Sequence, residues 1–262
     1  MISTEKKPIQ LSFHKFITMK YFNLIAYFAM IGMNYLAATL PLNNTTTGQV
    51  SNQYPTLFTP AGIAFSIWSV IYLLMFIFLV VQLFDKQKAN TGKIGWYFVL
   101  SCFFNIGWLF AWHYHLIGLS TLIMFLLLVS LLIANRNLSQ DGSRLAKAAF
   151  GIYLGWICVA AIANVSIFLV SLGWNGFGIP EPFWAAFMIL ATVVLTGIIV
   201  LQLKNPFLAL SVVWGLTGIF LARLENHPVL AYIAAGGVII IVATTIILFS
   251  HNKKKMTAKT PV

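Results

Sequence analysis

The chain has 262 residues, of which 60% are hydrophobic and only 8% are charged, and its formal net charge is +11. So few charged residues cannot cover the surface of a soluble domain of this size, which excludes a soluble globular protein. Continuous apolar runs of about 20 residues cross a bilayer as helices, and they lack the alternation of a β-barrel. Eight such runs predict an all-α, polytopic membrane bundle, at residues 20–42, 61–84, 94–114, 116–135, 147–171, 182–203, 206–224 and 228–250.

The basic residues are distributed unevenly between the two ends of these runs. All 16 Lys and Arg residues except Arg223 fall on one side of an eight-span topology, in the termini and in alternate connections. Membrane proteins retain positive charge on the cytoplasmic side, so both termini are predicted to be cytoplasmic. The charge therefore indicates topology and contact with anionic membrane lipid rather than a nucleic-acid partner. We expect a multi-pass protein of a bacterial plasma membrane.

Two polar segments allow more than one interpretation. Residues 1–19 are basic and amphipathic, and they form either an interfacial helix or a frayed terminus. Residues 41–59 are long for a membrane connection and carry no charge. A loop of this kind is either a lid over a site or a solvated connector.

A helix with proline in its first turn is predicted where the uncharged loop enters the second apolar run. Pro60 suits that turn, and the hydroxyl of Thr59 is expected to cap it. Ala64, Trp68 and Tyr72 follow at four-residue spacing, so they share one helical face with Pro60. Ala64 lets another backbone or a ligand come close, while Trp68 and Tyr72 add flat surface and polar groups.

The third apolar run also has a face that carries polar and aromatic residues. Asn105 lies near its middle, where an amide normally faces other helices, and Trp108 and Trp112 follow on the same face. His113 and His115 close the run. They are predicted to make interfacial hydrogen bonds at a tight turn, with haem or metal ligation as the alternative.

The fifth run carries a third set of this kind. Tyr153, Trp156, Ala160 and Asn164 recur at helical spacing, and Ala160 is small enough for close helix packing. The three faces together predict a cavity with aromatic walls and a few neutral hydrogen-bonding groups. Such a cavity suits a flat and weakly polar ligand.

These three motifs, in this order, resemble those of the TspO/MBR family of tryptophan-rich sensory proteins, which includes the mitochondrial translocator protein. The family's second helix has a Pro, a Trp eight residues later and a Tyr four residues further on. Its third helix has an Asn followed three residues later by a Trp, and its fifth has Tyr, Trp, Ala and Asn at helical spacing. The matching residues here are Pro60, Trp68, Tyr72, Asn105, Trp108, Tyr153, Trp156, Ala160 and Asn164.

The resemblance implies a five-helix fold and a tetrapyrrole ligand such as protoporphyrin or haem, with no cofactor required. It divides the chain into a basic cytoplasmic segment (1–19), a TspO-like domain (20–172), a module of three additional helices (173–250) and a basic cytoplasmic tail (251–262). A homodimer is a further expectation. The expected ligand-binding residues are Pro60, Ala64, Trp68, Tyr72, Asn105, Trp108, Trp112, Tyr153, Trp156, Ala160 and Asn164.

The charged residues of the last three runs are predicted to lie at helix ends. Glu181 is expected to begin a helix, where its charge is favourable to the helix dipole. Arg223 and Glu225 are expected to form an exposed ion pair. No ionisable group is expected at mid-membrane depth, which argues against a pump or a proton symporter.

The sequence shows no motif of an ordinary enzyme. It has no phosphate-binding loop, zinc motif or nucleophile motif, so no catalytic or metal-binding residue is predicted. Cys102 and Cys158 are expected to be buried thiols. The predicted function is therefore a membrane receptor or sensor for a flat hydrophobic small molecule. The alternatives are a transporter of hydrophobic molecules and light- or oxygen-dependent porphyrin turnover.

Overall fold

The fold is given by a computed structural model that describes residues 8–40, 42–84, 89–138 and 142–257. These residues form helices and connections, and no strand occurs among them. Three short 3-10 helices are η1 (Leu42–Asn44), η2 (Gly62–Ser66) and η3 (Gly176–Gly178). The α-helices are α1 (Pro8–Thr39), α2 (Thr47–Gln53), α3 (Ile67–Phe84), α4 (Ala89–Ile94), α5 (Tyr97–His113), α6 (Ile117–Leu138), α7 (Arg144–Ser171), α8 (Glu181–Leu203), α9 (Phe207–Arg223) and α10 (Pro228–Thr257).

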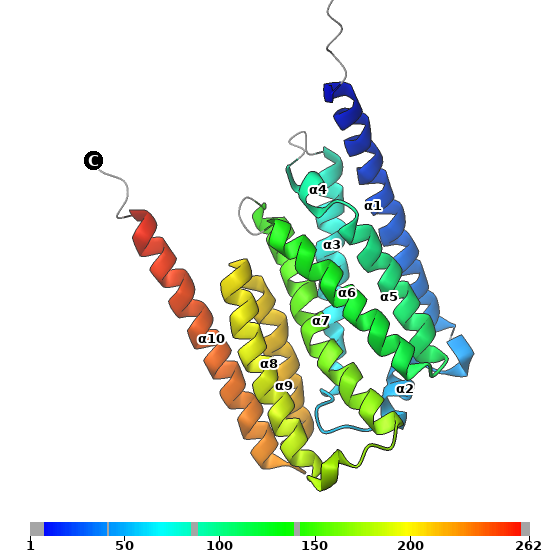
Figure 1. Ribbon diagram of the computed structural model, residues 1–262, viewed down its shortest axis with the longest axis vertical. Coiled ribbons are helices and arrows are strands. Elements are labelled where there is room, and N and C mark those ends of the chain that lie inside the picture. Colours follow the sequence, from blue (N-terminus) through cyan, green and yellow to red (C-terminus); the bar gives the residue numbers. More distant parts are fainter. Residues whose placement is uncertain (1–7, 41, 85–88, 139–141, 258–262) are drawn as a thin grey trace, which may run out of the picture.

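The long helices run lengthwise through the molecule, between its two ends (Figure 1). Six of the described helices are long and apolar enough to cross a membrane, while α5 and α9 are apolar but have 17 residues each. A helix of about 17 residues is at the lower limit of spanning length. The prediction of an all-α, polytopic membrane bundle is confirmed.

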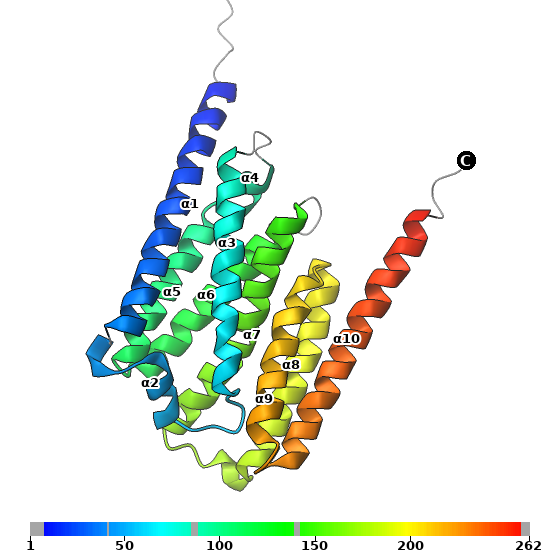
Figure 2. The same ribbon diagram turned by 180° about the vertical axis from the view of Figure 1, so that it is seen from behind.

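Both ends of the described chain lie at the same end of the bundle, opposite to α2 (Figures 1 and 2). The last turn of α6, with Arg136, and the start of α7, with Arg144, lie there too. This arrangement agrees with an even number of passes and with basic residues gathered on one side. We call the opposite end the α2 end.

The first and last helices extend beyond the apolar runs. Helix α1 begins at Pro8 and has 32 residues, so most of the basic segment 1–19 continues the first membrane helix. Helix α10 continues to Thr257, into the basic tail. Residues 1–7 and 258–262, the remaining parts of the two predicted terminal segments, lie outside the described residues.

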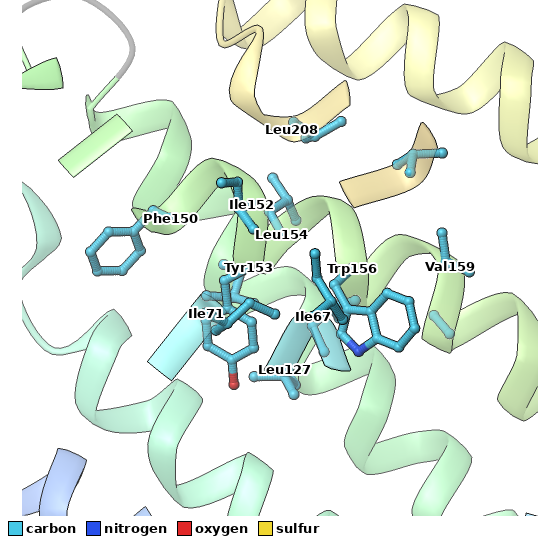
Figure 3. Close-up of a cluster of buried hydrophobic side chains, with 14 of the residues drawn as sticks. Ile67, Ile71, Leu127, Phe150, Ile152, Tyr153, Leu154, Trp156, Val159 and Leu208 are labelled. Atoms are coloured by element: carbon cyan, nitrogen blue, oxygen red, sulfur yellow. The ribbon is translucent and has the colours of Figure 1, made fainter. Parts of the chain in front are cut away.

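Helix α7 is the helix of the five-helix domain that packs most extensively on the C-terminal helices α8 to α10. It packs against α6 on one side and α9 on another, and residues 149–157 are all buried. Gly155 permits the close approach of α9, because a Cβ there would meet the carbonyl oxygen of Leu208 and the hydroxyl of Ser211. Tyr153 and Trp156 point away from Leu208, toward the interior of the five-helix domain (Figure 3).

The first part of the connection between α1 and α3 contains η1 and α2. We call residues 42–53 the folded cap. Thr46 and Gln49 form a reciprocal capping box at the start of α2, each side chain accepting a backbone N–H of the other. Val50 is fully buried in a small apolar cluster with Trp112, Ile117 and Ile167. The segment therefore packs on the bundle and is not a solvated connector.

Candidate ligand-binding site

A cavity of about 50 Å³ lies near the α2 end, bordered by α2, η2, α3, α5, α6 and α7. We call it the aromatic cavity, because its walls include Phe65 and four tryptophans. Four of the eleven predicted ligand-binding residues do not border it, namely Ala64, Tyr72, Asn105 and Tyr153. The other seven do, and they are Pro60, Trp68, Trp108, Trp112, Trp156, Ala160 and Asn164.

The aromatic rings of the cavity form two groups. Trp68 and Trp156 meet nearly at right angles with centroids 6.3 Å apart, and Phe65 contacts Trp156 in the same way at 5.7 Å. Trp108 and Trp112 are stacked at 5.4 Å. The walls therefore offer ring faces and ring edges, which both pack well against a flat apolar molecule.

One hydrogen-bond donor of the aromatic cavity has no partner. Trp156 is 2% exposed, and its indole Nε1 is buried without a hydrogen bond among the described residues. A buried N–H that is left unpaired costs about 1–3 kcal/mol. A ligand that places an acceptor atom next to the Trp156 N–H would therefore be stabilised by a hydrogen bond.

The amide of Asn164 orients Trp108. The Trp108 Nε1 donates to Asn164 Oδ1 at 3.2 Å, and the hydroxyl of Ser120 donates to the same oxygen at 3.4 Å. Asn164 Nδ2 donates in turn to the carbonyl of Ala160 at 3.2 Å. Both ends of this amide are satisfied within the protein, so its role visible here is to position an indole.

A chain of polar side chains connects four helices beside the aromatic cavity. The Tyr72 hydroxyl donates to Asn34 Oδ1 at 2.8 Å, and Asn34 Nδ2 donates to Asn105 Oδ1 at 2.8 Å. Asn105 Nδ2 then donates to the Tyr153 hydroxyl at 3.4 Å. These four residues tie α1, α3, α5 and α7 together in the membrane, where such bonds are a main source of helix association.

Two members of this polar chain pack against Trp68, which borders the aromatic cavity. Trp68 stacks on Tyr72 at 5.5 Å and meets Tyr153 edge-on at 5.9 Å. Asn34 was not among the predicted site residues, although an amide within an apolar helix is itself a signal for contact with other helices.

Ala64 contacts the C-terminal helices instead of the cavity. A Cβ added to Gly218 of α9 would lie 2.7 Å from the Ala64 Cβ, so the two backbones are close. Trp214 Nε1 donates to the Ala64 carbonyl at 2.9 Å, and the Ala61 N–H donates to the Gly218 carbonyl at 3.0 Å. Of the two predicted uses of this small residue, the structure shows the approach of another backbone.

The folded cap closes the aromatic cavity at the α2 end. Trp112 Nε1 donates to the Thr47 carbonyl at 3.1 Å, and Asn43 Nδ2 donates to the His113 carbonyl at 3.0 Å. The two ring nitrogens of the buried His113 lie 2.8 Å from the Leu109 carbonyl and 3.4 Å from the Thr47 hydroxyl. These contacts support the hydrogen-bonding interpretation of His113 over haem or metal ligation.

The C-terminal helices hold the loop that precedes η2. Arg223 donates to the carbonyls of Leu57 at 3.0 Å and of Thr56 and Thr59 at 3.1 Å each. Glu181, which begins α8 as predicted, accepts the N–H of Leu57 at 2.7 Å. We call this arrangement the loop clamp.

Two predictions about these residues are wrong. Arg223 makes no ion pair with Glu225, because its guanidinium is engaged by the three loop carbonyls. Thr59 does not cap a helix, since its hydroxyl lies 2.9 Å from the Thr56 hydroxyl and the turn that follows is the 3-10 helix η2. The helix predicted from residue 61 becomes regular α3 only at Ile67.

A bundle of apolar helices around an aromatic cavity defines a multi-pass integral membrane protein with a candidate site for a hydrophobic molecule. The model of the TSPO-like protein family matches residues 20–247. The chain belongs to this family, which confirms the resemblance seen in the motifs. The match extends past residue 172 and includes α8, α9 and most of α10. No curated protein and no solved structure matches the chain.

Proposed function

We propose that the protein is a membrane receptor or sensor that binds a tetrapyrrole, such as protoporphyrin or haem, in the aromatic cavity. The observation that carries the proposal is a cavity bordered by four indoles, one of which has a buried and unpaired N–H. A planar macrocycle would stack on the rings, and one of its nitrogen or carboxylate acceptors would pair with Trp156. Membership in the TSPO-like family supports a binding role in the membrane. We place the protein in a bacterial plasma membrane.

The aromatic cavity has to widen before such a ligand fits. Its volume of about 50 Å³ is well below the roughly 300–1,000 Å³ of typical ligand pockets. The folded cap is the wall most able to move, because it is attached through one small apolar cluster and a few hydrogen bonds. Binding is therefore a two-step event, in which the cap lifts and the ligand enters beneath it.

Titration of purified full-length protein in a nonionic detergent tests the proposal. Protoporphyrin and haem are added separately, and the shift of the porphyrin absorption band is followed to saturation. We expect one site per chain, and a loss of affinity of about fivefold in Trp156→Phe, because that variant lacks one hydrogen-bond donor. The matched control is Trp96→Phe, since Trp96 is 50% exposed and does not border the cavity. The proposal fails if neither tetrapyrrole binds saturably.

The same preparation separates binding from the two alternatives. Net porphyrin flux into sealed vesicles that contain the protein would instead favour a transporter. Light-dependent loss of porphyrin absorption, abolished by Trp108→Phe or Trp156→Phe, would favour turnover. The expected homodimer stays a prediction.

A further inference from the structure

A second cavity, of about 250 Å³, lies at the α2 end between the five-helix domain and the C-terminal helices. Its walls are the loop of residues 56–58, the end of α7, the connection that contains η3 and the start of α8. It shares no lining residue with the aromatic cavity. We call it the head cavity.

Two tryptophans form an aromatic corner in the head cavity. Trp174 and Trp184 meet edge-to-face with ring centroids 4.9 Å apart. Trp184 is fixed by a hydrogen bond of 3.0 Å from its Nε1 to the Gly176 carbonyl. The Trp184 donor is thus occupied, and what this ring offers to a ligand is its electron-rich face.

One carboxylate belongs to the same cavity. Glu181 is the only charged residue among the described residues that line it, and one of its oxygens accepts the Leu57 N–H at 2.7 Å. Arg223 binds carbonyls of the same loop and its charge interacts with that of Glu181, but it does not line the cavity. Ring faces beside a carboxylate attract an ammonium group, through cation–π attraction and a charge-assisted contact.

An apolar groove continues from the head cavity along α8. This groove, of about 380 Å³, is lined by residues of α6, α7 and α8, and Met188 borders both spaces. Among the described residues that line it, the two with hydroxyl groups are Thr192 and Thr196, which donate to the helix carbonyls of Met188 and Thr192. We call it the tail groove, because it offers a continuous apolar surface at membrane depth.

We propose that the head cavity and the tail groove together bind a single-chain amphiphile with an ammonium head group and an alkyl tail. The head group lies against Trp174, Trp184 and Glu181, and the tail follows α8 past Met188. The shared chemistry, a quaternary or protonated amine on an alkyl chain, occurs in choline lipids and in free cationic amphiphiles. This site is separate from the aromatic cavity and does not depend on the proposed tetrapyrrole.

Photoaffinity labelling of the full-length protein tests the site. The protein is placed in nanodiscs of phosphatidylglycerol, which has no amine, and the probe is an alkyltrimethylammonium with a diazirine at the end of its chain. We expect cross-links to peptides of α7 and α8. Dodecyltrimethylammonium should compete, whereas dodecanol, which lacks the charge, and tetramethylammonium, which lacks the tail, should compete at least about threefold less well.

Two substitutions test the binding of the head group and the binding of the alkyl tail separately. Glu181→Gln keeps an oxygen that can accept the Leu57 N–H but removes the charge, so labelling should weaken by about threefold to tenfold while the fold is retained. Glu225→Gln is the matched control at the same end of the bundle. Ala191→Phe fills the tail groove, and it should abolish the dependence of competition on chain length.

The outcomes also identify the source of the amphiphile. Competition by lysophosphatidylcholine as strong as that by dodecyltrimethylammonium supports a choline lipid, and weaker competition supports a free cationic amphiphile. Unchanged labelling in Glu181→Gln, or equal competition by dodecanol, overturns the proposal. Trp108→Phe should leave labelling unchanged, so failure of the tetrapyrrole site is distinguishable from failure of this one.

Discussion

The guanidinium of Arg223, in the last turn of α9, donates a hydrogen bond of 3.1 Å to the carbonyl of Thr59, which lies 164 positions earlier in the chain. Thr59 borders the aromatic cavity, and its neighbours Thr56 and Leu57 accept from the same side chain. The C-terminal helices therefore hold a wall of the candidate site in the five-helix domain.

Arg223→Met should loosen the loop of residues 54–60. Methionine keeps the apolar stem but removes three part-buried hydrogen bonds from a charged donor, a kind of bond that is worth about 1.5–3 kcal/mol. We expect faster hydrogen exchange at these residues in detergent, with little change in α5 and α6. Arg144→Met, at the opposite end of the bundle, is the control. Equal exchange in the two variants would show that the clamp does not order the loop.

Gly218→Ala should push η2 away from α9. The new methyl group would lie 2.7 Å from the Ala64 Cβ and 2.9 Å from the Pro60 Cβ, and neither of these carbons can rotate away. Overpacking of this kind costs about 1–3 kcal/mol, so the midpoint of thermal unfolding should fall.

Gly197→Ala is the matched control for this substitution. Apart from its chain neighbours and the backbone of its own helix, no atom of the described residues lies within 4 Å of its added methyl group, and alanine is the better helix former. Its unfolding midpoint should be unchanged or higher. A midpoint for Gly218→Ala that is as high as that of the control would refute the close packing of α9 on η2.

The Asn34–Asn105 hydrogen bond should show energetic coupling in a double-mutant cycle. Removing either amide leaves one polar group of the other, Asn34 Nδ2–H or Asn105 Oδ1, without its partner across the helices, so the first substitution costs more than the second. We expect a coupling energy of about 0.6–1.7 kcal/mol, the range found for hydrogen bonds between membrane helices. The measurement is the unfolding free energy of Asn34→Ala, Asn105→Ala and the double variant in mixed micelles. Strict additivity would contradict the polar chain.

Much of the helical architecture follows from the sequence, because a bilayer leaves backbone groups no partner outside the helix. The predicted runs at 116–135 and 182–203 correspond closely to α6 and α8. The three indoles at residues 68, 108 and 156 do border one cavity, since helical spacing places residues of one face together.

Other features of the site have no local signature in the sequence. Thr59 has the chemistry of a helix cap, but the Ala61 N–H is taken by the Gly218 carbonyl of α9. Arg223 has an acidic neighbour at position 225 but binds backbone carbonyls of a loop far away in the chain. The volume of the aromatic cavity is also not encoded in residue spacing, because it depends on how the folded cap packs against α5 and α7.

Trp112→Phe should speed the entry of protoporphyrin into the aromatic cavity. The substitution keeps most of the ring surface but removes the 3.1 Å hydrogen bond to the Thr47 carbonyl, one of the contacts that hold the cap closed. A hydrogen bond of this kind contributes about 1 kcal/mol, so lifting of the cap should become about fivefold more frequent. The association rate, measured by stopped-flow absorption at several porphyrin concentrations, should rise by that factor. Trp96→Phe should leave the rate unchanged, because Trp96 precedes α5, whereas the cap binds the last turn of that helix. A rate for Trp112→Phe equal to that of the unmodified protein would mean that the ligand enters by another route, between the helices.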